Sequence, residues 1–433
     1  MRITVVGGGY VGLTTGICFS HLGYEVKVVE KVPQKVSMLN EGVVPIYEPG
    51  LEDMLKDSLR LKRISFTTDL VEGLEFSEII FICVGTPQQE DGSADLSQVE
   101  EVARHTAEHM KSYKLLVEKS TVPVNTHKLI KKTLQRYMKR HVEFDVASNP
   151  EFLREGSAVK DFLEPDRIVV GVESERAKSI LQKLYEPIKA PILFTDPATA
   201  ELIKHASNSF LAMKISFINM ISDLCEKTGA DVKLVADGMG YDKRIGRAFL
   251  DAGIGWGGSC FPKDVRAFIK MAEDYGVDFS LLREVDKINA KRIENFLEKV
   301  KNALWSLKNK KLAVWGLSFK PNTDDIREAP SIKIVSALLR EGASLQLYDP
   351  KAMNNFRRIF PEGEDLTYAR DMYEAIKGCD ALLILTEWEE FKKADLERVK
   401  HLLKLPIVID GRNIYEPAHM RELGFEYYCM GRQ

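Results

Sequence analysis

Short apolar runs alternate with amphipathic segments through the first half of the chain. The runs are rich in β-branched residues and lie at 3–6, 25–29, 78–84, 115–120, 145–148, 167–172 and 192–194. A short apolar run bounded by turn residues is typical of a buried strand, and the segment 13–22 has the pattern of a helix. We therefore predict an open parallel sheet whose strands are connected by helices.

A single long helix is predicted in the middle of the chain. Residues 197–228 contain no internal proline or glycine, and their apolar positions cover more than one face. At about 1.5 Å per residue, such a helix is on the order of 45 Å long. Its length and its broad apolar surface indicate a spine between two domains and a candidate subunit interface.

The C-terminal part repeats the alternation of strands and helices after a helical run at 265–306 and a lysine-rich linker. Strands are predicted at 312–315, 344–348, 381–385 and 407–409, with a helix at 331–341. The predicted fold is α/β, with two Rossmann-like doubly wound domains joined by the long central helix. The predicted divisions are an N-terminal domain at 1–196, a central helical region at 197–307 and a C-terminal domain at 308–433.

The composition is that of an ordinary globular protein. Hydrophobic residues make up 45% of the chain and charged residues 29%, with a formal net charge of −3. This charge gives no basis for binding nucleic acid or an anionic membrane, and no apolar run approaches the roughly 20 residues of a spanning helix. The six cysteines are scattered without a C-x-x-C pair, as in reduced cytosolic enzymes. We expect a soluble cytoplasmic protein without a secretion signal or a metal.

A dinucleotide fingerprint follows the first strand. Gly7, Gly9 and Gly12 have the spacing G-x-G-x-x-G. In such a turn the first glycine allows the bend, the second lets the backbone approach a pyrophosphate, and the third allows close packing of helix on strand. Glu30 ends the second strand, where an acid accepts hydrogen bonds from a ribose diol, so NAD is predicted. Lys35 is either a ribose contact or a solvated helix residue.

Polar residues stand at the carboxyl ends of three further predicted strands. Thr86 and Thr121 precede prolines in their turns, and Glu151 and Glu155 lie in Asn149-Pro-Glu-Phe-Leu-Arg-Glu155. Ligands of open parallel sheets bind beyond these ends, although such turns are also common without a ligand. Glu151 and Glu155 are spaced by one helical turn, which predicts that both face one pocket or that one is solvated.

The long helix and the segment after it carry the remaining candidate chemistry. Lys204 and Asn208 share one helix face, as a polar edge or as a cation and an amide directed into a site. Four glycines at 253, 255, 257 and 258 precede Cys260, and Lys263 and Asp264 follow it. A cysteine beside a cation is a candidate nucleophile; the alternative is a tight glycine turn with a buried, inert cysteine. In the C-terminal domain, the basic residues Lys320, Arg327 and Arg412 stand at strand ends.

These motifs, in this order, resemble those of the UDP-glucose/GDP-mannose dehydrogenase family. The resemblance spans essentially the whole chain and rests on Gly7–Gly12, Gly85–Pro87, Ser120–Pro123, Asn149–Glu155, Gly257–Asp264 and Gly316–Asp325. It implies two Rossmann-like domains, a dimerising central helix, and oxidation of the C6 alcohol of UDP-glucose to a carboxylate with two NAD reduced in turn. The implied partners are therefore a UDP-sugar substrate and a second copy of the chain.

The resemblance also implies roles for individual residues. Cys260 is the nucleophile that forms a thiohemiacetal and then a thioester, and Lys204 and Asn208 stabilise the oxyanion. Asp264 and Thr121 hold water, and Glu155 transfers a proton. Implied NAD contacts are Gly7, Gly9, Tyr10, Val11, Gly12, Glu30, Lys35, Thr86, Thr121, Glu155, Lys263 and Arg327. Implied substrate contacts are Glu151, Phe152, Leu153, Arg154, Glu155, Lys204, Asn208, Phe249, Leu250, Asp251, Ala252, Gly253, Gly257 and Lys320, with Arg244 supplied by the dimer partner.

Departures from the family pattern leave alternatives open. Glu30 stands where aspartate is frequent, and Asn125 stands in place of a more usual glycine. Asp251 adds an acid to the loop expected to bind a diphosphate, which costs little if that loop binds through its backbone but repels phosphate if the side chain points inward. Ser259 speaks against relatives that act on UDP-N-acetylmannosamine, which tend to have histidine there. GDP-mannose is the alternative substrate, and a non-catalytic nucleotide-binding protein is the alternative outside the class.

Overall fold

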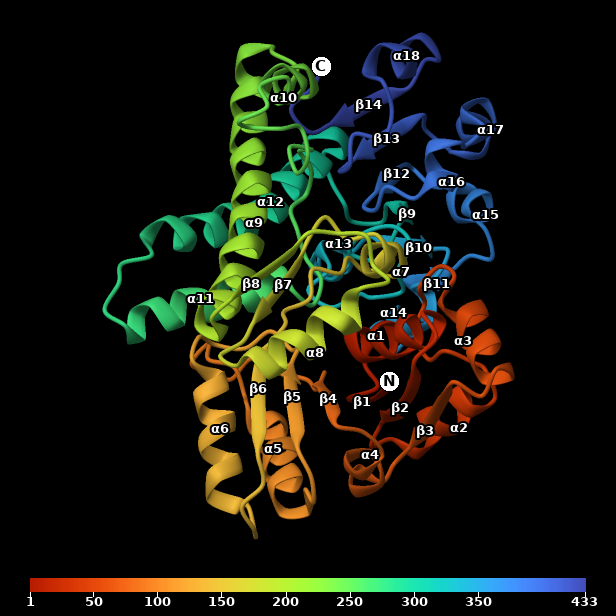
Figure 1. Cartoon of the computed structure of the whole chain (residues 1–433). Helices are drawn as coiled ribbons and strands as arrows, with labels where there is room; N and C mark the ends of the chain where they lie inside the picture. The colour runs from red at the N-terminus through yellow and green to blue at the C-terminus, as the bar shows by residue number, and fades with distance from the viewer. The chain divides into compact units, whose positions relative to one another are not determined.

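The computed structural model describes residues 1–433, which form two compact units. Unit 1 contains residues 1–207 and 266–275, and unit 2 contains residues 208–265 and 276–433. The long helix α9 (Pro197–Thr228) and the helix α11 (Phe261–Asp274) each pass from one unit into the other. The predicted α/β fold with two parallel sheets and a long connecting helix is confirmed (Figure 1).

Unit 1 is built on an eight-stranded sheet in the order β3-β2-β1-β4-β5-β6-β7-β8. Its strands are β1 (Arg2–Val6), β2 (Glu25–Val29), β3 (Ile64–Thr67), β4 (Ile79–Ile82), β5 (Lys114–Glu118), β6 (Phe144–Ser148), β7 (Ile168–Gly171) and β8 (Ile192–Thr195). Neighbouring strands are parallel except β6 and β7. Residues of β4 and β5 are buried throughout, because helices cover both faces of a parallel sheet.

Eight helices connect these strands before α9 begins. They are α1 (Tyr10–His21), α2 (Pro33–Asn40), α3 (Leu51–Arg60), α4 (Leu70–Phe76), α5 (Ser97–His109), α6 (Thr126–Tyr137), α7 (Ala158–Leu163) and α8 (Glu175–Tyr185). Strands β1 to β3 are added toward one edge of the sheet and β4 to β8 toward the other, so the switch point lies between β1 and β4. Ligands of doubly wound folds bind at this point, beside the turns that follow the two strands.

Unit 2 contains a six-stranded, all-parallel sheet in the order β11-β10-β9-β12-β13-β14. Its strands are β9 (Lys311–Trp315), β10 (Ser344–Tyr348), β11 (Leu366–Tyr368), β12 (Ala381–Ile384), β13 (Ile407–Asp410) and β14 (Glu426–Cys429). The helices among them are α13 (Pro330–Arg340), α14 (Met353–Arg357), α15 (Met372–Ile376), α16 (Glu389–Lys392), α17 (Leu396–Leu402) and α18 (Pro417–Glu422). This order repeats that of β3 to β6 around β1, with its switch point between β9 and β12.

The predicted helix at 197–228 is confirmed as α9, but the predicted single run at 265–306 is wrong. The structure has α11 and then α12 (Ser280–Leu304), separated by residues 275–279. Gly276 follows α11 with φ +70°, a left-handed conformation in which glycine commonly ends a helix. The shorter α10 (Val232–Gly240) begins at Asp231, whose side chain accepts hydrogen bonds from Lys233 N and Leu234 N.

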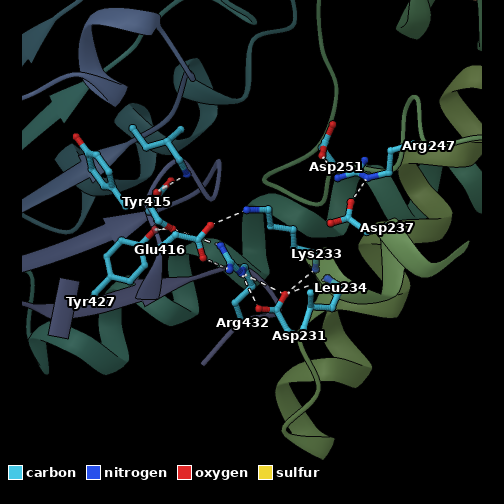
Figure 2. Close-up of polar contacts among 12 residues, drawn as sticks. Asp231, Lys233, Leu234, Asp237, Arg247, Asp251, Tyr415, Glu416, Tyr427 and Arg432 are labelled. Atoms are coloured by element: carbon cyan, nitrogen blue, oxygen red, sulfur yellow. Dashed lines mark hydrogen bonds and ion pairs between the residues drawn. The ribbon is translucent and has the colours of Figure 1, made fainter. Parts of the chain in front are cut away.

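The C-terminal end of the chain is fastened to α10 by ion pairs (Figure 2). Arg432 pairs with Asp231 at 3.0 Å and with Glu416 at 2.6 Å, and its side chain is almost fully buried. Lys233 pairs with the other carboxylate oxygen of Glu416 at 2.6 Å. These contacts join three segments of unit 2. No helix in the chain is both long enough and apolar enough to cross a membrane.

Candidate active site

The turn between β1 and α1 depends on two glycines. Gly7 has φ +112°, and a Cβ there would lie 2.3 Å from the carbonyl oxygen of Cys83. A Cβ at Gly12 would lie 1.8 Å from the carbonyl oxygen of Gly7, so α1 packs directly on the turn. A Cβ at Gly9 would meet nothing within 4 Å, so the start of α1 is open. Open backbone at a helix N-terminus fits the pyrophosphate of NAD.

Glu30 lies just beyond β2 and is 6% exposed. Its carboxylate accepts a hydrogen bond from Val32 N at 2.9 Å and lies 3.8 Å from Lys35 Nζ. A Cβ at Gly8 would lie 2.5 Å from Glu30 Oε2, so Gly8 makes room for this carboxylate. Gly8 stands at a variable position of the G-x-G-x-x-G motif, so the motif did not predict that a glycine is needed there. Lys35 on α2 contacts the predicted ribose acceptor, and its role toward ribose stays a prediction.

The ends of β4 and β5 are tied together. Thr86 Oγ1 donates a hydrogen bond to the carbonyl oxygen of Thr121 at 3.0 Å. Next to them, a small cavity of about 10 Å³ is lined by Glu118, Ser120, Thr121, Val122, Ser148, Pro150, Glu201 and Lys204. This volume is about that of one water centre, and its walls carry several polar groups. The strand ends of unit 1 therefore place Thr121 beside Lys204.

Lys204 of α9 is held by a carboxylate from the loop after β6. Its Nζ donates to Glu151 Oε1 at 2.9 Å, and both side chains are almost fully buried. The other oxygen of Glu151 accepts from Leu153 N at 2.6 Å. The Phe152 ring lies 5.4 Å from Lys204 Nζ and 3.7 Å from the Arg167 guanidinium. A buried cation held on several sides is pre-positioned for a ligand, because its orientation costs nothing further on binding.

The prediction that Glu151 and Glu155 are one helical turn apart is wrong. Residues 149–157 form a loop, and α7 begins only at Ala158. The cause is the carboxylate of Glu48, which accepts hydrogen bonds from Gly156 N and Ala158 N at 2.7 Å each and so fixes the loop. Arg154 is committed to Asp161 in a two-pronged ion pair with a shortest distance of 2.6 Å.

Two buried carboxylates in unit 1 are functional candidates that the sequence alone does not reveal. Glu201 accepts hydrogen bonds from Asn125 N at 2.6 Å, His127 N at 3.0 Å and Ser148 Oγ at 3.1 Å. Glu118 accepts from Ser120 N at 2.8 Å, whereas its Oε2 is buried without a hydrogen-bond partner. Burial, with a contribution from nearby Glu201, raises the pKa of Glu118 to about 8. These contacts join residues up to 76 positions apart in sequence, which local patterns do not encode.

Asn125 stands in place of a glycine for a structural reason. Its φ is +74°, and asparagine is the non-glycine residue that tolerates this left-handed conformation best. Its side-chain amide also donates to the Tyr275 hydroxyl at 3.0 Å. The departure from the expected glycine is therefore conservative for the backbone.

Cys260 differs from the other five cysteines, because it alone is not buried. Burial raises the pKa of Cys83, Cys379 and Cys429 to about 12, so these thiols stay protonated and inert. The Cys260 carbonyl accepts from Asp264 N at 2.8 Å, so the residue sits at the start of the helix α11. Its Sγ lies 3.5 Å from Ser259 Oγ. The positive end of a helix dipole favours a thiolate at this position.

Asp264 lies one turn along α11 from Cys260 and is 1% exposed. Its Oδ2 accepts a hydrogen bond from Asn208 Nδ2 at 2.7 Å, and its Oδ1 lies 3.4 Å from Lys263 Nζ. Two alternatives were open for Asn208: its amide is buried and turned toward Asp264 instead of lying on an exposed polar edge. One N–H of the Asn208 amide remains for a ligand, because the amide has two and the carboxylate takes one.

The loop before Cys260 is anchored by a set of buried polar residues. Gly253 N donates to Asn219 Oδ1 at 2.8 Å, and Gly253 O accepts from Arg292 Nε at 3.0 Å. Trp256 N donates to Asn289 Oδ1 at 2.8 Å. The fully buried Arg292 also contacts α9 through the Asn219 carbonyl. Asn219 of α9 and Asn289 and Arg292 of α12 therefore hold the loop in place. Nothing in the sequence indicated that these three residues support the loop.

The glycines nearest Cys260 pack against the loop after β9. A Cβ at Gly257 would lie 2.3 Å from the Glu328 carbonyl oxygen, and one at Gly258 would lie 2.7 Å from the Phe319 ring. Gly258 N also donates to the Arg327 carbonyl oxygen at 2.9 Å. The loop that carries Lys320 and Arg327 is therefore in contact with the cysteine loop within unit 2. Glycine is required at both positions because these two loops of the same chain pack closely.

Basic side chains near this loop have distinct surroundings. Arg412 donates to the carbonyl oxygens of Leu385 at 2.9 Å and Gly255 at 3.1 Å, so it binds backbone. Arg327 forms a two-pronged pair with Asp325, with a shortest distance of 2.6 Å. Gly316, at the turn after β9, has φ +94°, and a Cβ there would lie 2.5 Å from Thr386 N. This turn repeats the geometry of Gly7 in unit 1.

Asp251 points to solvent, and its side chain pairs with Arg247 at 2.6 Å (Figure 2). Arg247 also pairs with Asp237 at 2.5 Å. Because the Asp251 carboxylate is 83% exposed and paired with Arg247, it does not repel a phosphate that binds the backbone of this loop. The neighbouring candidates differ in burial: Leu250, Ala252 and Gly253 are buried, and Phe249 is half-buried. Arg244 is exposed and pairs with Asp242 at 2.6 Å.

The sheet order, the glycine turn and Glu30 are those of a dinucleotide-binding Rossmann unit, and unit 2 repeats the same sheet order. Models of the UDP-glucose/GDP-mannose dehydrogenase family match the chain as an NAD binding domain at residues 1–189, a central domain at 198–291 and a UDP binding domain at 313–417. The chain belongs to this family. The NAD cofactor and the oxidoreductase class predicted from sequence are thereby confirmed.

Relatives are similar over the whole of this chain and over more than nine-tenths of their own length. The UDP-glucose 6-dehydrogenase TuaD of Bacillus subtilis is 45% identical, with 100% of this chain and 93% of that protein covered. A UDP-glucose dehydrogenase structure from Pyrobaculum islandicum has a TM-score of 0.93 at 38% identity, covering 100% and 98%. A UDP-D-ManNAc dehydrogenase structure from Pyrococcus horikoshii has a TM-score of 0.87 at 30% identity, covering 100% and 99%.

Proposed function

We propose that the chain is a UDP-glucose 6-dehydrogenase, which oxidises the C6 alcohol of UDP-glucose to a carboxylate while two NAD are reduced. The observation that carries the proposal is Cys260, the one cysteine outside the core, at the start of α11 and close to the Asn208–Asp264 pair. A simple alcohol dehydrogenase needs no thiol. An aldehyde, in contrast, must first add a nucleophile before it has a hydride to lose.

Cys260 supplies that nucleophile in the proposed mechanism. Its Sγ forms a C–S bond to the aldehyde carbon, and the thiol proton leaves, giving a thiohemiacetal oxyanion. Loss of hydride from this carbon leaves a thioester on Cys260, and water then cleaves the C–S bond to give the carboxylate and the free thiol. The turn at Gly7, Gly9 and Gly12 and the carboxylate of Glu30 would hold NAD, which when bound would supply the hydride acceptor for both oxidations.

Other residues are proposed to serve this chemistry by charge and hydrogen bonding. Lys204 Nζ and the second N–H of Asn208 stabilise the oxyanion. Asp264, with Thr121, holds the hydrolytic water, and Glu155 is the proposed proton acceptor. Burial of Lys204, Asn208 and Asp264 supports these roles, because electrostatic contacts are stronger where water is excluded.

The test is NADH formation by the purified protein. UDP-glucose should yield two NADH per sugar, and Cys260→Ser should lower steady-state turnover by about three orders of magnitude. Cys225→Ser, a buried cysteine in α9, is the matched control and should retain activity. Normal turnover by the Cys260→Ser protein would exclude the thioester mechanism. UDP-galactose, GDP-mannose and UDP-N-acetylmannosamine in parallel assays test the sugar and the base, with GDP-mannose as the alternative substrate.

We further propose that the chain works as a homodimer in the cytoplasm. The α9 side chains of Phe210, Phe217 and Leu224 are spaced by seven residues and are 58%, 41% and 58% exposed. An apolar stripe along a helix is typical of a subunit interface. Exposed Arg244 is available to a partner's nucleotide. The absence of any disulfide among the six cysteines supports a reducing compartment.

A further inference from the structure

A second cluster of metal-binding side chain types lies on α5, in the part of unit 1 that carries no proposed catalytic residue. His105, Glu108 and His109 offer one ligand atom each, and these atoms lie within 4.8 Å of one another. Their spacing of three and four residues places them on one face of the helix. All three side chains are half-buried, so the cluster is reachable from solvent.

The histidine hydrogen bonds prepare this face for a cation. His109 Nδ1 lies 2.9 Å from the His105 carbonyl oxygen, and as its donor it leaves the Nε2 lone pair available. A backbone carbonyl that fixes the tautomer of a histidine is the usual second partner of a metal-binding imidazole. The two rings are nearly parallel, at an interplanar angle of 14° and a centroid distance of 6.0 Å.

His105 has an unsatisfied nitrogen. Its Nδ1 is buried and has no hydrogen-bond partner. A buried polar atom without a partner is uncommon in folded proteins and calls for an explanation, of which a bound ion is one. The His105 imidazole is therefore not committed at Nδ1 to another protein group.

Neighbouring charges leave the cluster accessible to a cation. Arg104 lies 3.8 Å from Glu108 and 3.6 Å from Glu100, both on α5, distances at which an exposed ion pair is weak. On α4, Glu75 is paired with Lys111 at 2.5 Å. Glu108 can therefore turn from Arg104 to a metal ion at little cost.

We propose that His105, Glu108 and His109 form a binding site for a divalent transition metal, with zinc as the representative ion. Two imidazoles and a carboxylate suit zinc, copper or nickel, whereas magnesium and calcium prefer oxygen ligands. Zinc–nitrogen bonds are about 2.0–2.1 Å long, so the ligand atoms close in by rotamer changes of the half-buried side chains. A fourth position remains for water.

The experiment is zinc titration of the full chain by isothermal calorimetry after chelator treatment and removal of any affinity tag. The Cys260→Ala protein is used throughout, because the half-buried thiol of Cys260 is itself a potential zinc ligand. We expect one zinc per chain, and replacement of both His105 and His109 by alanine should weaken binding at least about tenfold. Glu108→Gln should also weaken zinc binding, and this variant replaces the double variant in the test if the double variant does not fold.

His401→Ala is the matched control. His401 on α17 makes the same bond from Nδ1 to the carbonyl four residues earlier, Glu397 O at 2.7 Å, but it belongs to no cluster of this kind. Its variant should bind zinc like the parent, and cobalt in place of zinc should give visible absorption bands that the double variant lacks. Unchanged affinity in both the double variant and Glu108→Gln would overturn the proposal.

Discussion

Replacement of Glu118 by glutamine should stabilise the protein increasingly as the pH rises. Glu118 is 1% exposed at the end of β5, and its Oε2 has no hydrogen-bond partner. Burial and the nearby Glu201 carboxylate raise its pKa from 4.5 to about 8. Glutamine keeps the shape of the protonated acid and the acceptor for Ser120 N, but it never ionises.

The expected size follows from proton linkage. The folded protein holds the Glu118 proton more tightly than the unfolded chain does, so stability from this group is full below about pH 4.5 and is lost as pH rises through about 8. A change from 4.5 to about 8 corresponds to an upper bound of about 5 kcal/mol at about 1.4 kcal/mol per pH unit. Between pH 6 and pH 8, the Glu118→Gln protein should gain about 2–3 kcal/mol relative to the parent.

Urea unfolding at pH 6, 7 and 8, followed by far-UV circular dichroism, measures this gain. All four tryptophans, at 256, 305, 315 and 388, lie in unit 2, so their fluorescence reports on the unit that lacks Glu118. Glu75→Gln, an exposed acid whose pKa Lys111 lowers, is the control and should show a constant difference over this range. If the free energy of unfolding of Glu118→Gln and of the parent changed equally with pH, Glu118 would not have a raised pKa.

Two further predictions concern the cysteine loop and the proposed dimer. Gly257→Ala should lower the free energy of unfolding by about 1–3 kcal/mol and kcat at least tenfold, because its Cβ would lie 2.3 Å from Glu328 O. Gly238→Ala in α10 is the control and should be harmless, because its Cβ would meet nothing within 4 Å. NADH assays and urea titrations compare the two variants, and a fully active Gly257→Ala enzyme would contradict the packing argument. Phe217→Glu should halve the mass in sedimentation, and Leu129→Glu, exposed on α6, should not; an unchanged mass for Phe217→Glu would place the interface elsewhere.

Regular elements were predictable where one local pattern dominated. The bounds of α9 agree with the predicted 197–228, because no helix-breaking residue interrupts it. The strands β3, β11 and β14 were missed, because each is only three or four residues long and gives too short a pattern to recognise. The run at 265–306 was predicted as one helix because its helical periodicity resumes after Gly276.

Candidate site residues were predictable where a motif fixed them. The glycine turn, Glu30, Lys204, Asn208, Cys260 and Asp264 all came from sequence, and the structure brings Thr86 to Thr121, Lys204 to Glu151 and Asn208 to Asp264. The supports were not predictable. Glu201 contacts a segment 74 to 76 positions away, and Arg292 contacts residues 39 to 73 positions away.

The α/β class, the NAD fingerprint, the family resemblance and a candidate reactive cysteine follow from the sequence alone, because each depends on residues that are neighbours along the chain. Tertiary packing alone shows which cysteines are buried, that Asp251 faces Arg247, and that Glu118 Oε2 is buried without a hydrogen-bond partner near Glu201. Burial and pairing depend on contacts between distant segments. Gly257 is a further example. A side chain there would collide with the Glu328 carbonyl oxygen, a contact that the local sequence around Gly257 does not reveal.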